Sequence, residues 1–419
     1  MEKEGKPVLK KGEEIAKQFK KSMEPSDELK LDFRDTAIAF ADKSDEDLRK
    51  TAWLFGMMNK HWLVGIGAKL GMTAIKLHLP FVESVVKNTI FRQFCGGTTL
   101  LESQQTIEKL YASKILSILD YGAEAKETEE DFNNTMNENI RALEFAANNE
   151  SAWMVSTKIT GLARFALLEK VSSHEALTEA ESEEWNTVVK RVGAVCYKAE
   201  QLNVGVMIDA EETWIQGAID KLVTQMMSRH NKEKAIVYGT FQMYLKDRLE
   251  HLKTAFIHSQ QYGYLLGAKL VRGAYMEKER RRAQELGYPS PIHDTKAHTD
   301  ESYNAGLRFC LEHYEKIALC NASHNEKSCM LMAQTIAQQQ LDKRHPHLLS
   351  AQLLGMSDNL TYNLAKHNFR TAKYIVYGSV KEVVPYLIRR AEENSSVTGD
   401  MTREHRFVVQ EMKRRGLNT

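Results

Sequence analysis

The sequence predicts an α/β fold, a (β/α)8 barrel of the TIM type with a helical region before it. From about Ile115 onward, short apolar runs with polar ends alternate with longer charged segments of helical periodicity. Eight such runs occur over roughly 280 residues, which matches the strand number and size of this barrel. With 419 residues, of which 42% are hydrophobic, the chain can bury one large core and still carry a smaller region.

The first region, residues 1–110, is expected to be helical, and residues 111–419 are expected to form the barrel and a C-terminal helix. The segment from Lys10 to Leu110 has a helical rhythm, and the whole chain contains only seven prolines. Ser44-x-x-Asp47 resembles a capping box and predicts the start of one helix. The apolar stretch from Trp62 to Ala68 is interrupted by Lys69, so it is too short to span a bilayer.

The barrel strands are expected at the eight apolar runs. In chain order these are residues 115–120, 152–159, 203–209, 235–241, 266–272, 316–323, 349–355 and 372–378. A doubly wound sheet is the competing fold, but it would place a glycine fingerprint after its first strand. The nearest match, Gly65-x-Gly67-x-x-x-Gly71, has the wrong spacing and no strand before it.

Composition excludes several classes of function. The formal net charge is +1, and the basic run Glu277–Arg282 is diluted by acids and has no interleaved aromatic residues, so we expect no nucleic-acid partner. Five cysteines without a C-x-x-C motif indicate free thiols, and an N-terminus without an apolar core indicates a cytoplasmic protein. We expect no metal, because the histidines lack the spacing of a metal site. These are His293, His298, His345 and His347.

Polar side chains follow seven of the eight expected strands. In a barrel of this type the carboxyl ends of all the strands meet at one rim, where the active site lies. The polar residues at these ends are Asp120, Glu124, Lys158, Asp209, Glu211, Glu212, Gln242, Lys269, Arg272, Tyr275, Ser323, His324, Asn325, Tyr374 and Tyr377.

The helix expected after the eighth strand carries a distinct pattern. Tyr386, Arg389, Arg390 and Glu393 are spaced i, i+3, i+4 and i+7, so they share one helical face. Two neighbouring guanidinium groups suit a carboxylate or a phosphate. Because this helix follows the last strand directly, we expect it to stand over the barrel mouth and to bind an anion.

Several motifs together resemble the proline dehydrogenase family over roughly residues 90 to 400. They are DYGAE (120–124), VSTKIT (155–160), MIDAEE (207–212), KLVRGAYMEKER (269–280), GYPSPIHDTKAHTDESYN (287–304), ASHN (322–325), LLGMSDNL (353–360) and YLIRRAEENSS (386–396). The resemblance implies a distorted (β/α)8 barrel that binds FAD and oxidises L-proline to Δ1-pyrroline-5-carboxylate, the first step of proline catabolism. It also implies that a membrane quinone accepts the electrons. No aldehyde dehydrogenase module follows the barrel, so the single-function form is expected.

The resemblance also implies roles for individual residues. Arg389, Arg390 and Lys158 would bind the proline carboxylate. Four side chains would line the pyrrolidine ring, namely Tyr275, Leu353, Tyr374 and Tyr386, with Tyr374 excluding hydroxyproline. Residues that would contact or support FAD are Asp209, Gln242, Lys269, Arg272, Ala274, Lys296, His324 and Ser396. Supporting ion pairs would come from Asp120, Glu124 and Glu393. The sequence departs from some relatives at Lys269, where they have arginine, and at Met276, where they have tryptophan.

Two other classes of function stay open at this point. Lys158 could form a Schiff base in an aldolase. Alternatively, the face with Arg389 and Arg390 could dock an acidic peptide in a protein without catalytic activity. A flavoenzyme that reduces a membrane quinone would have no transmembrane segment here and would contact the inner membrane face peripherally.

Overall fold

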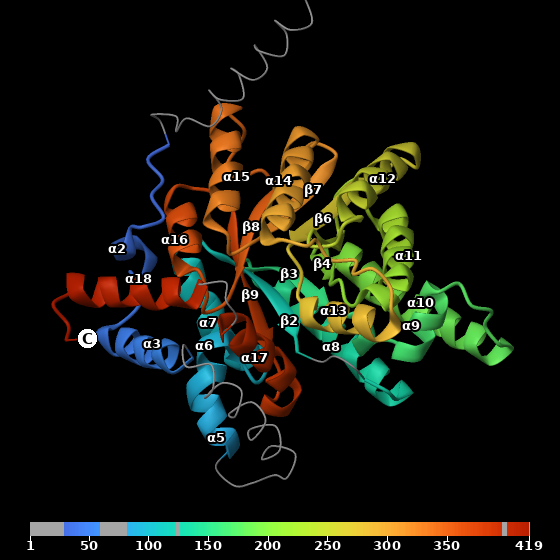
Figure 1. The fold of residues 1–419 in the computed structure, drawn as a ribbon, viewed down its shortest axis with the longest axis horizontal. Helices are drawn as coiled ribbons and strands as arrows, with labels where there is room; N and C mark the ends of the chain where they lie inside the picture. The colour runs from blue at the N-terminus through green and yellow to red at the C-terminus, as the bar shows by residue number, and fades with distance from the viewer. Residues whose placement is uncertain (1–28, 59–81, 123–125, 396–399, 419) are drawn as a thin grey trace, which may run out of the picture.

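A computed structural model describes residues 29–58, 82–122, 126–395 and 400–418 of the chain. Its centre is a closed barrel of eight parallel strands surrounded by helices (Figure 1). The strands are β2 (Leu116–Tyr121), β3 (Ala152–Thr157), β4 (Gly205–Ile208), β5 (Val237–Gln242), β6 (Leu266–Val271), β7 (Ile317–Ala322), β8 (Leu348–Leu353) and β9 (Thr371–Tyr377). Each of the eight strand predictions is therefore confirmed.

The barrel closes because β9 pairs with both β2 and β8. Leu119 of β2 lies opposite Ile375 of β9, and Leu353 of β8 lies opposite Tyr374 of β9. All pairings between consecutive strands are parallel, so the eight carboxyl ends meet at one rim.

Helices surround the barrel and follow its strands. They are α7 (Leu100–Ala112), α8 (Glu129–Ala147), α9 (Phe165–Ser172), α10 (Glu179–Leu202), α11 (Thr213–His230), α12 (Arg248–Gln261), α13 (Met276–Leu286), α14 (Lys296–Glu312), α15 (Glu326–Gln338), α16 (Asp358–Lys366), α17 (Val380–Ser395) and α18 (Asp400–Arg414), with a 3-10 turn at Ile159–Gly161. Local sequence sets several of their ends. Thr178 and Glu181 form a capping box at the start of α10, and Gly287 ends α13 with a φ of 72°.

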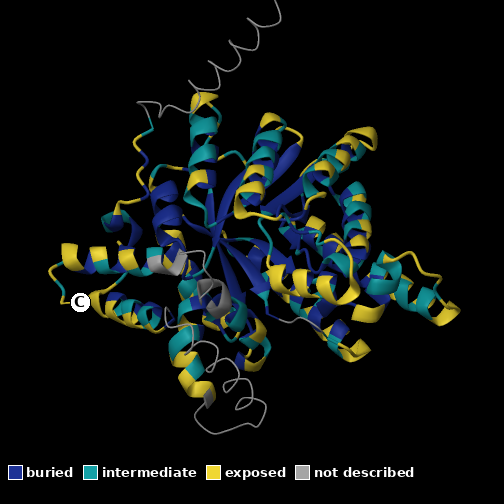
Figure 2. Ribbon diagram, in the orientation of Figure 1, coloured by how far each residue is buried: buried dark blue, intermediate teal, exposed yellow. Residues whose placement is uncertain are grey.

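Residues in each strand alternate between two cores. Ile118, Met207 and Cys320 belong to a cluster inside the barrel, whereas their neighbours Leu119 and Ile208 belong to the larger cluster between the strands and the helices. Figure 2 shows the strands as the most deeply buried part of the fold. Because every second residue of a strand faces into the barrel, this alternation decides which side chains can reach the barrel mouth.

The described residues of the N-terminal region, 29–58 and 82–110, form mostly helices and also supply a strand. Its elements are α2 (Thr36–Ala39), α3 (Asp45–Met58), α5 (Val82–Val86), a π-helical turn at Lys87–Phe91, α6 (Arg92–Phe94) and β1 (Cys95–Gly97). The capping interaction is confirmed, because Asp47 N–H donates to the Ser44 hydroxyl oxygen at 3.1 Å. β1 was not predicted, and it pairs with β9 at Cys95 and Val376.

The N-terminal helices and the C-terminal helix share a second apolar core. Phe55 of α3, Leu387 of α17 and Val408 of α18 all belong to it. Residues 62–71, with the glycine pattern considered above, lie outside the described part of the chain. Within the described residues, none of the helices is both long and apolar enough to cross a membrane.

Candidate active site

Several of the expected rim residues continue the inward-facing rows of the barrel strands. In β3 the row runs from Met154 through Ser156 to Lys158, which follows the last residue of the strand. The corresponding row in β2 ends at Asp120, and the one in β4 leads from Met207 to Asp209. An apolar layer inside the barrel is thus covered by a polar layer at the carboxyl ends of the strands.

Two lysines and two aspartates meet in this layer. The Lys158 Nζ atom lies 3.0 Å from Asp209 Oδ2 and 3.3 Å from Asp120 Oδ2. The Lys269 ammonium forms an ion pair with Asp209 Oδ1. All four side chains are at most 14% exposed, so water screens their interactions little. The structure therefore brings together two predicted cofactor residues, a predicted substrate residue and a predicted supporting acid.

The two aspartates have opposite pKa shifts. Burial raises the pKa of Asp120 to about 6; Lys158 opposes this shift and the charge of Asp209 adds to it. Burial also acts against ionisation of Asp209, but Lys269 and Lys158 outweigh it and lower the pKa of Asp209. Asp209 thus stays ionised between two ammonium groups. Asp120, whose pKa is raised, takes up a proton at a higher pH than Asp209 does.

Tyr374 and Ser156 complete this network. The Tyr374 hydroxyl lies 2.9 Å from Asp209 Oδ1 and 3.3 Å from Lys269 Nζ, and it also contacts the Ser156 hydroxyl. Ser156 donates to the same Asp209 oxygen at 2.9 Å. These bonds fix the Tyr374 ring against the inner wall. Sequence reasoning missed Ser156, although it lies in the same strand row as Lys158.

A second polar group surrounds Glu211 at the end of β4. Gln242 Nε2 donates to the Glu211 carbonyl at 2.7 Å, and the Ala274 N–H donates to Gln242 Oε1 at 3.4 Å. The Glu211 carboxyl accepts from the Thr160 N–H at 3.0 Å, and burial raises its pKa to about 7. Gln242 and Ala274 thus lie together, as expected. Glu211 was expected at the rim without a stated role, and the contact from Thr160 was missed.

A third group offers positive charge beyond β6. Arg272 Nε donates to Asp300 Oδ1 at 2.7 Å, and Lys296 Nζ donates to Asp300 Oδ2 at 2.8 Å. Arg272 also bonds the Ser323 hydroxyl at 2.9 Å, and its guanidinium lies 4.3 Å from the centre of the Tyr303 ring. Because two cations share one carboxylate, this part of the rim keeps a net positive charge, which suits the phosphates of a dinucleotide.

The arginine helix α17 places aromatic and cationic groups over the rim. The Arg390 guanidinium lies 5.2 Å from the centre of the Tyr386 ring, and both residues are buried. Burial raises the pKa of Tyr275; Glu211 adds to this shift, whereas the positive charges of Arg389 and Lys158 oppose it. Arg389, Lys158 and Tyr275 are therefore close enough to share one electrostatic environment.

Other expected site residues lie around this mouth or outside the described chain. Leu353, at the end of β8, packs against both the barrel interior and the second core. His324 follows β7, and its Nδ1 atom lies 2.9 Å from the Ser357 hydroxyl. Glu124 and Ser396 lie outside the described residues, and only the backbone of Glu393 is described, as part of α17.

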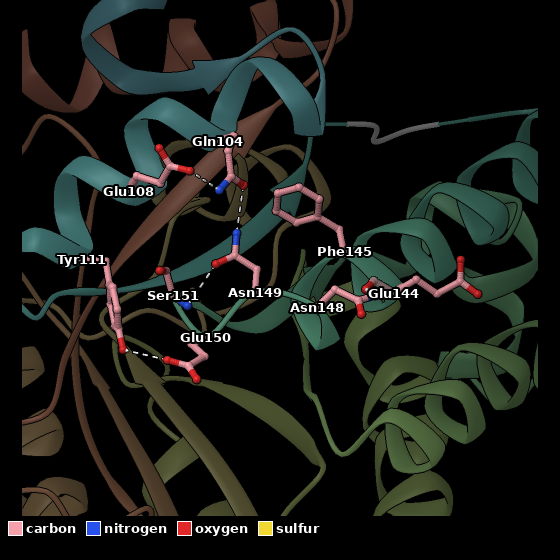
Figure 3. A pocket seen from close by; sticks show the side chains of 9 residues that line it. All are labelled: Gln104, Glu108, Tyr111, Glu144, Phe145, Asn148, Asn149, Glu150 and Ser151. Atoms are coloured by element: carbon pink, nitrogen blue, oxygen red, sulfur yellow. Dashed lines mark hydrogen bonds between the residues drawn. The ribbon is translucent and has the colours of Figure 1, made fainter.

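A surface hollow of about 620 Å³ lies away from this mouth. Its lining comes from α7, the end of α8 and the segment before β3, which is the amino-terminal end of the barrel (Figure 3). Gln104 of α7 links two sides of the hollow, because its Oε1 atom accepts from Asn149 at 2.9 Å. None of the expected site residues lines this hollow.

Comparison with known proteins identifies the family. Residues 103–403 match the family model described as proline dehydrogenase. The chain is 35% identical to the carbapenem antibiotics biosynthesis protein CarD of Pectobacterium carotovorum, over 77% of this chain and 83% of that protein. It is 31% identical to the mitochondrial proline dehydrogenase 2 of Arabidopsis thaliana, over 94% of this chain and 92% of that protein.

Solved structures support the fold. Proline utilization A from Bdellovibrio bacteriovorus, inactivated by N-propargylglycine, aligns with a TM-score of 0.66 at 20% identity, over 91% of this chain. The present chain spans only 38% of that longer protein. The expected barrel architecture and the match over 103–403 agree, and the chain belongs to the proline dehydrogenase family of oxidoreductases.

Proposed function

We propose that this protein oxidises L-proline to Δ1-pyrroline-5-carboxylate, with FAD as the bound cofactor and a membrane quinone as the final electron acceptor. The observation that carries the proposal is the network of cations and tyrosine at the barrel mouth, in which Lys158 and Lys269 share Asp209 and the Tyr374 hydroxyl contacts both Asp209 and Lys269. Family membership supports the reaction class, and several of the similar proteins are named proline dehydrogenases.

Substrate binding is proposed to begin with the carboxylate of proline. Arg389 and Arg390 would clamp it from α17, and Lys158 would approach it from the end of β3. Tyr275, Leu353, Tyr374 and Tyr386 would enclose the apolar ring. The buried Asp209 supports this arrangement, because it holds Lys158 at 3.0 Å and fixes the ring of Tyr374 through its hydroxyl.

The chemistry requires a neutral amine and exclusion of water. Positive charge from the cations favours loss of the proton from the proline amine. Their ion-pair partners, Asp120 and Asp209, limit this effect and keep the cations in place. When bound, FAD supplies the group that accepts a hydride from the carbon next to the nitrogen. The buried rings of Tyr275, Tyr374 and Tyr386 would keep that carbon away from water.

The FAD site is proposed to extend across the rim from β4 to β7. Asp209, Gln242, Lys269 and Ala274 would surround the flavin end, and Arg272 and Lys296 would face the phosphates. His324 and Ser396 would complete the site. The donor set fits such a cofactor, because it combines backbone and amide groups near Gln242 with the net positive charge around Asp300.

The geometry at Lys158 argues against the aldolase alternative. A Schiff base needs a neutral amine as nucleophile, but two carboxylates lie within 3.3 Å of the Lys158 ammonium and favour its charged form.

The electron acceptor and the location follow from the same proposal, because reduction of a membrane quinone requires peripheral contact with the membrane. Cytoplasmic location remains an expectation, and the Arabidopsis relatives are named mitochondrial.

One spectroscopic experiment tests the proposal. The purified protein should be yellow, and its flavin absorbance should bleach when L-proline is added without oxygen. Denaturation should then release FAD, and treatment with borohydride should trap no substrate on Lys158. A colourless folded protein, or a yellow one that does not respond to L-proline, would refute the proposed reaction.

A further inference from the structure

Ser357, which precedes α16, has an unusual conformation. It is fully buried and has a left-handed φ of 51°, which is costly for a residue with a side chain. A serine before a helix usually accepts a hydrogen bond from the first turn, but Ser357 makes no such bond. Its hydroxyl instead faces His324 at the end of β7 and two residues of α18.

The hydroxyl of Ser357 contacts three side chains. It donates to Glu404 Oε1 at 3.2 Å, accepts from Arg403 at 3.2 Å and lies 2.9 Å from His324 Nδ1. A serine has only one hydrogen to donate. Arg403 can only donate and an ionised Glu404 can only accept, which assigns the hydroxyl hydrogen to Glu404 and leaves the oxygen as the acceptor toward the imidazole. Under this assignment the hydrogen of the neutral His324 ring lies on Nδ1.

The surroundings of His324 favour a neutral ring. Burial and the positive charges of Lys373, Arg390, Arg403 and Arg272 keep its pKa well below the usual range. Within the described part of the chain, the second ring nitrogen, Nε2, has no hydrogen-bond partner. With hydrogen on Nδ1 and no positive charge, this nitrogen is a pure acceptor.

We propose that Ser357, Glu404 and Arg403 are positioning residues that hold His324 with its hydrogen on Nδ1, so that Nε2 accepts a hydrogen bond from FAD. This inference rests on the proposed function. It also assigns the part of FAD that His324 contacts. Phosphate oxygens only accept hydrogen bonds and cannot pair with an unprotonated Nε2. The partner is therefore a hydroxyl of the ribityl chain or the ribose, or an N–H group, whereas Arg272 and Lys296 remain for the phosphates.

The anchor comes from the C-terminal helix. Glu404 is 3% exposed and lies one residue beyond the segment that matches the family model, which ends at Arg403. Arg403 reinforces the link by donating to the His324 carbonyl at 3.0 Å. Because α18 packs on α3 and α2, the orientation of a cofactor ligand depends on contacts between the two ends of the chain.

Ser357→Gly is the decisive variant. Glycine adopts the left-handed conformation easily, so the change removes the hydroxyl while it relieves backbone strain. The readout is the tautomer of His324 in 15N-histidine-labelled, FAD-loaded protein, measured from the coupling of each ring nitrogen to the carbon-bound protons. His324→Asn assigns the signal. Arg406→Gln, at an exposed position of α18, is the matched control.

In the wild type and the control we expect hydrogen on Nδ1 and an unprotonated Nε2. In Ser357→Gly we expect hydrogen on Nε2 and a dissociation constant for FAD that is raised about tenfold, as for one lost hydrogen bond. A wild-type ring with hydrogen on Nε2, or a doubly protonated ring, would overturn the proposal. If Ser357→Gly changes the His324 tautomer but leaves the affinity for FAD unchanged, the proposed hydrogen bond between His324 and FAD is wrong. If the wild type binds no FAD, the proposed function fails, and the tautomer of the cofactor-free protein still tests the Ser357 network.

Discussion

Replacement of Glu211 by glutamine should make the protein more stable at high pH. The carboxyl of Glu211 is 3% exposed, accepts from the Thr160 N–H at 3.0 Å and contacts the Thr160 hydroxyl. Burial raises its pKa from 4.5 to about 7, the bonds from Thr160 oppose this shift, and the nearby charge of Glu212 adds to it. A charged Glu211 is thus an unfavourable state that the folded protein adopts only as the pH rises.

The sign and size of the effect follow from proton linkage. The folded protein holds the Glu211 proton more tightly than the unfolded chain, so this contribution to stability is complete below about pH 4.5 and is lost as the pH rises through about 7. A shift of this size corresponds to about 3 kcal/mol. Glutamine can keep both bonds, because its oxygen accepts from the Thr160 N–H and its amide donates to the Thr160 hydroxyl.

The free energy of unfolding, measured by urea denaturation of FAD-saturated protein at about pH 5, 7 and 9, checks this reasoning. Glu211→Gln should match the wild type at low pH and exceed it by up to about 3 kcal/mol at high pH. Glu233→Gln, at an exposed glutamate, is the control and should leave the wild-type pH profile unchanged. If the free energy of unfolding of Glu211→Gln has the same pH dependence as that of the wild type, or is lower than it at pH 9, the raised pKa of Glu211 in the folded protein is refuted.

Four further substitutions test the proposed site. Arg389→Met and Arg390→Met should each weaken proline binding by roughly 2 to 5 kcal/mol while FAD stays bound, and unchanged steady-state kinetics in both would place the carboxylate elsewhere. Tyr374→Ser should lower kcat/KM for proline by roughly 1 to 3 kcal/mol and narrow the preference for proline over hydroxyproline; an unchanged ratio would remove its role in specificity. Asp209→Asn removes the carboxylate that two buried lysines share, so urea denaturation should show a loss of about 3 to 5 kcal/mol, and wild-type stability would contradict the importance of this ion pair.

The barrel strands were predictable because their signal is local. Each is a short apolar run between polar ends, and burial on both faces requires such a run in a parallel sheet. β1 gives no such signal, since Cys95-Gly-Gly97 is three residues long and contains two glycines. It is a strand because Val376 and Tyr377 of β9 offer it a partner, which is information from tertiary structure.

The charged part of the mouth was predictable for a related reason. Lys158 and Asp209 directly follow β3 and β4, and Lys269 interrupts the apolar run of β6, so each charge is conspicuous in the sequence. Uncharged hydroxyl groups carry no comparable signal, and Ser156 would have been found only by extending the inward row of its strand. Glu404 could not be found in this way, because it reaches Ser357 from a different helix, 47 residues away in sequence.

The boundary expected at residue 110 describes a change of sequence pattern, and the second apolar core extends across it. Phe55 from the N-terminal region packs in the same cluster as Leu387 of α17 and Val408 of α18. A polar link follows the same route: Lys43 lies 3.7 Å from Asp358, which also pairs with the fully buried Lys373 at 2.8 Å. Because α17 carries Arg389 and Arg390, both ends of the chain support the helix that we propose to bind the substrate carboxylate. The N-terminal helices therefore share with α17 the core that positions it.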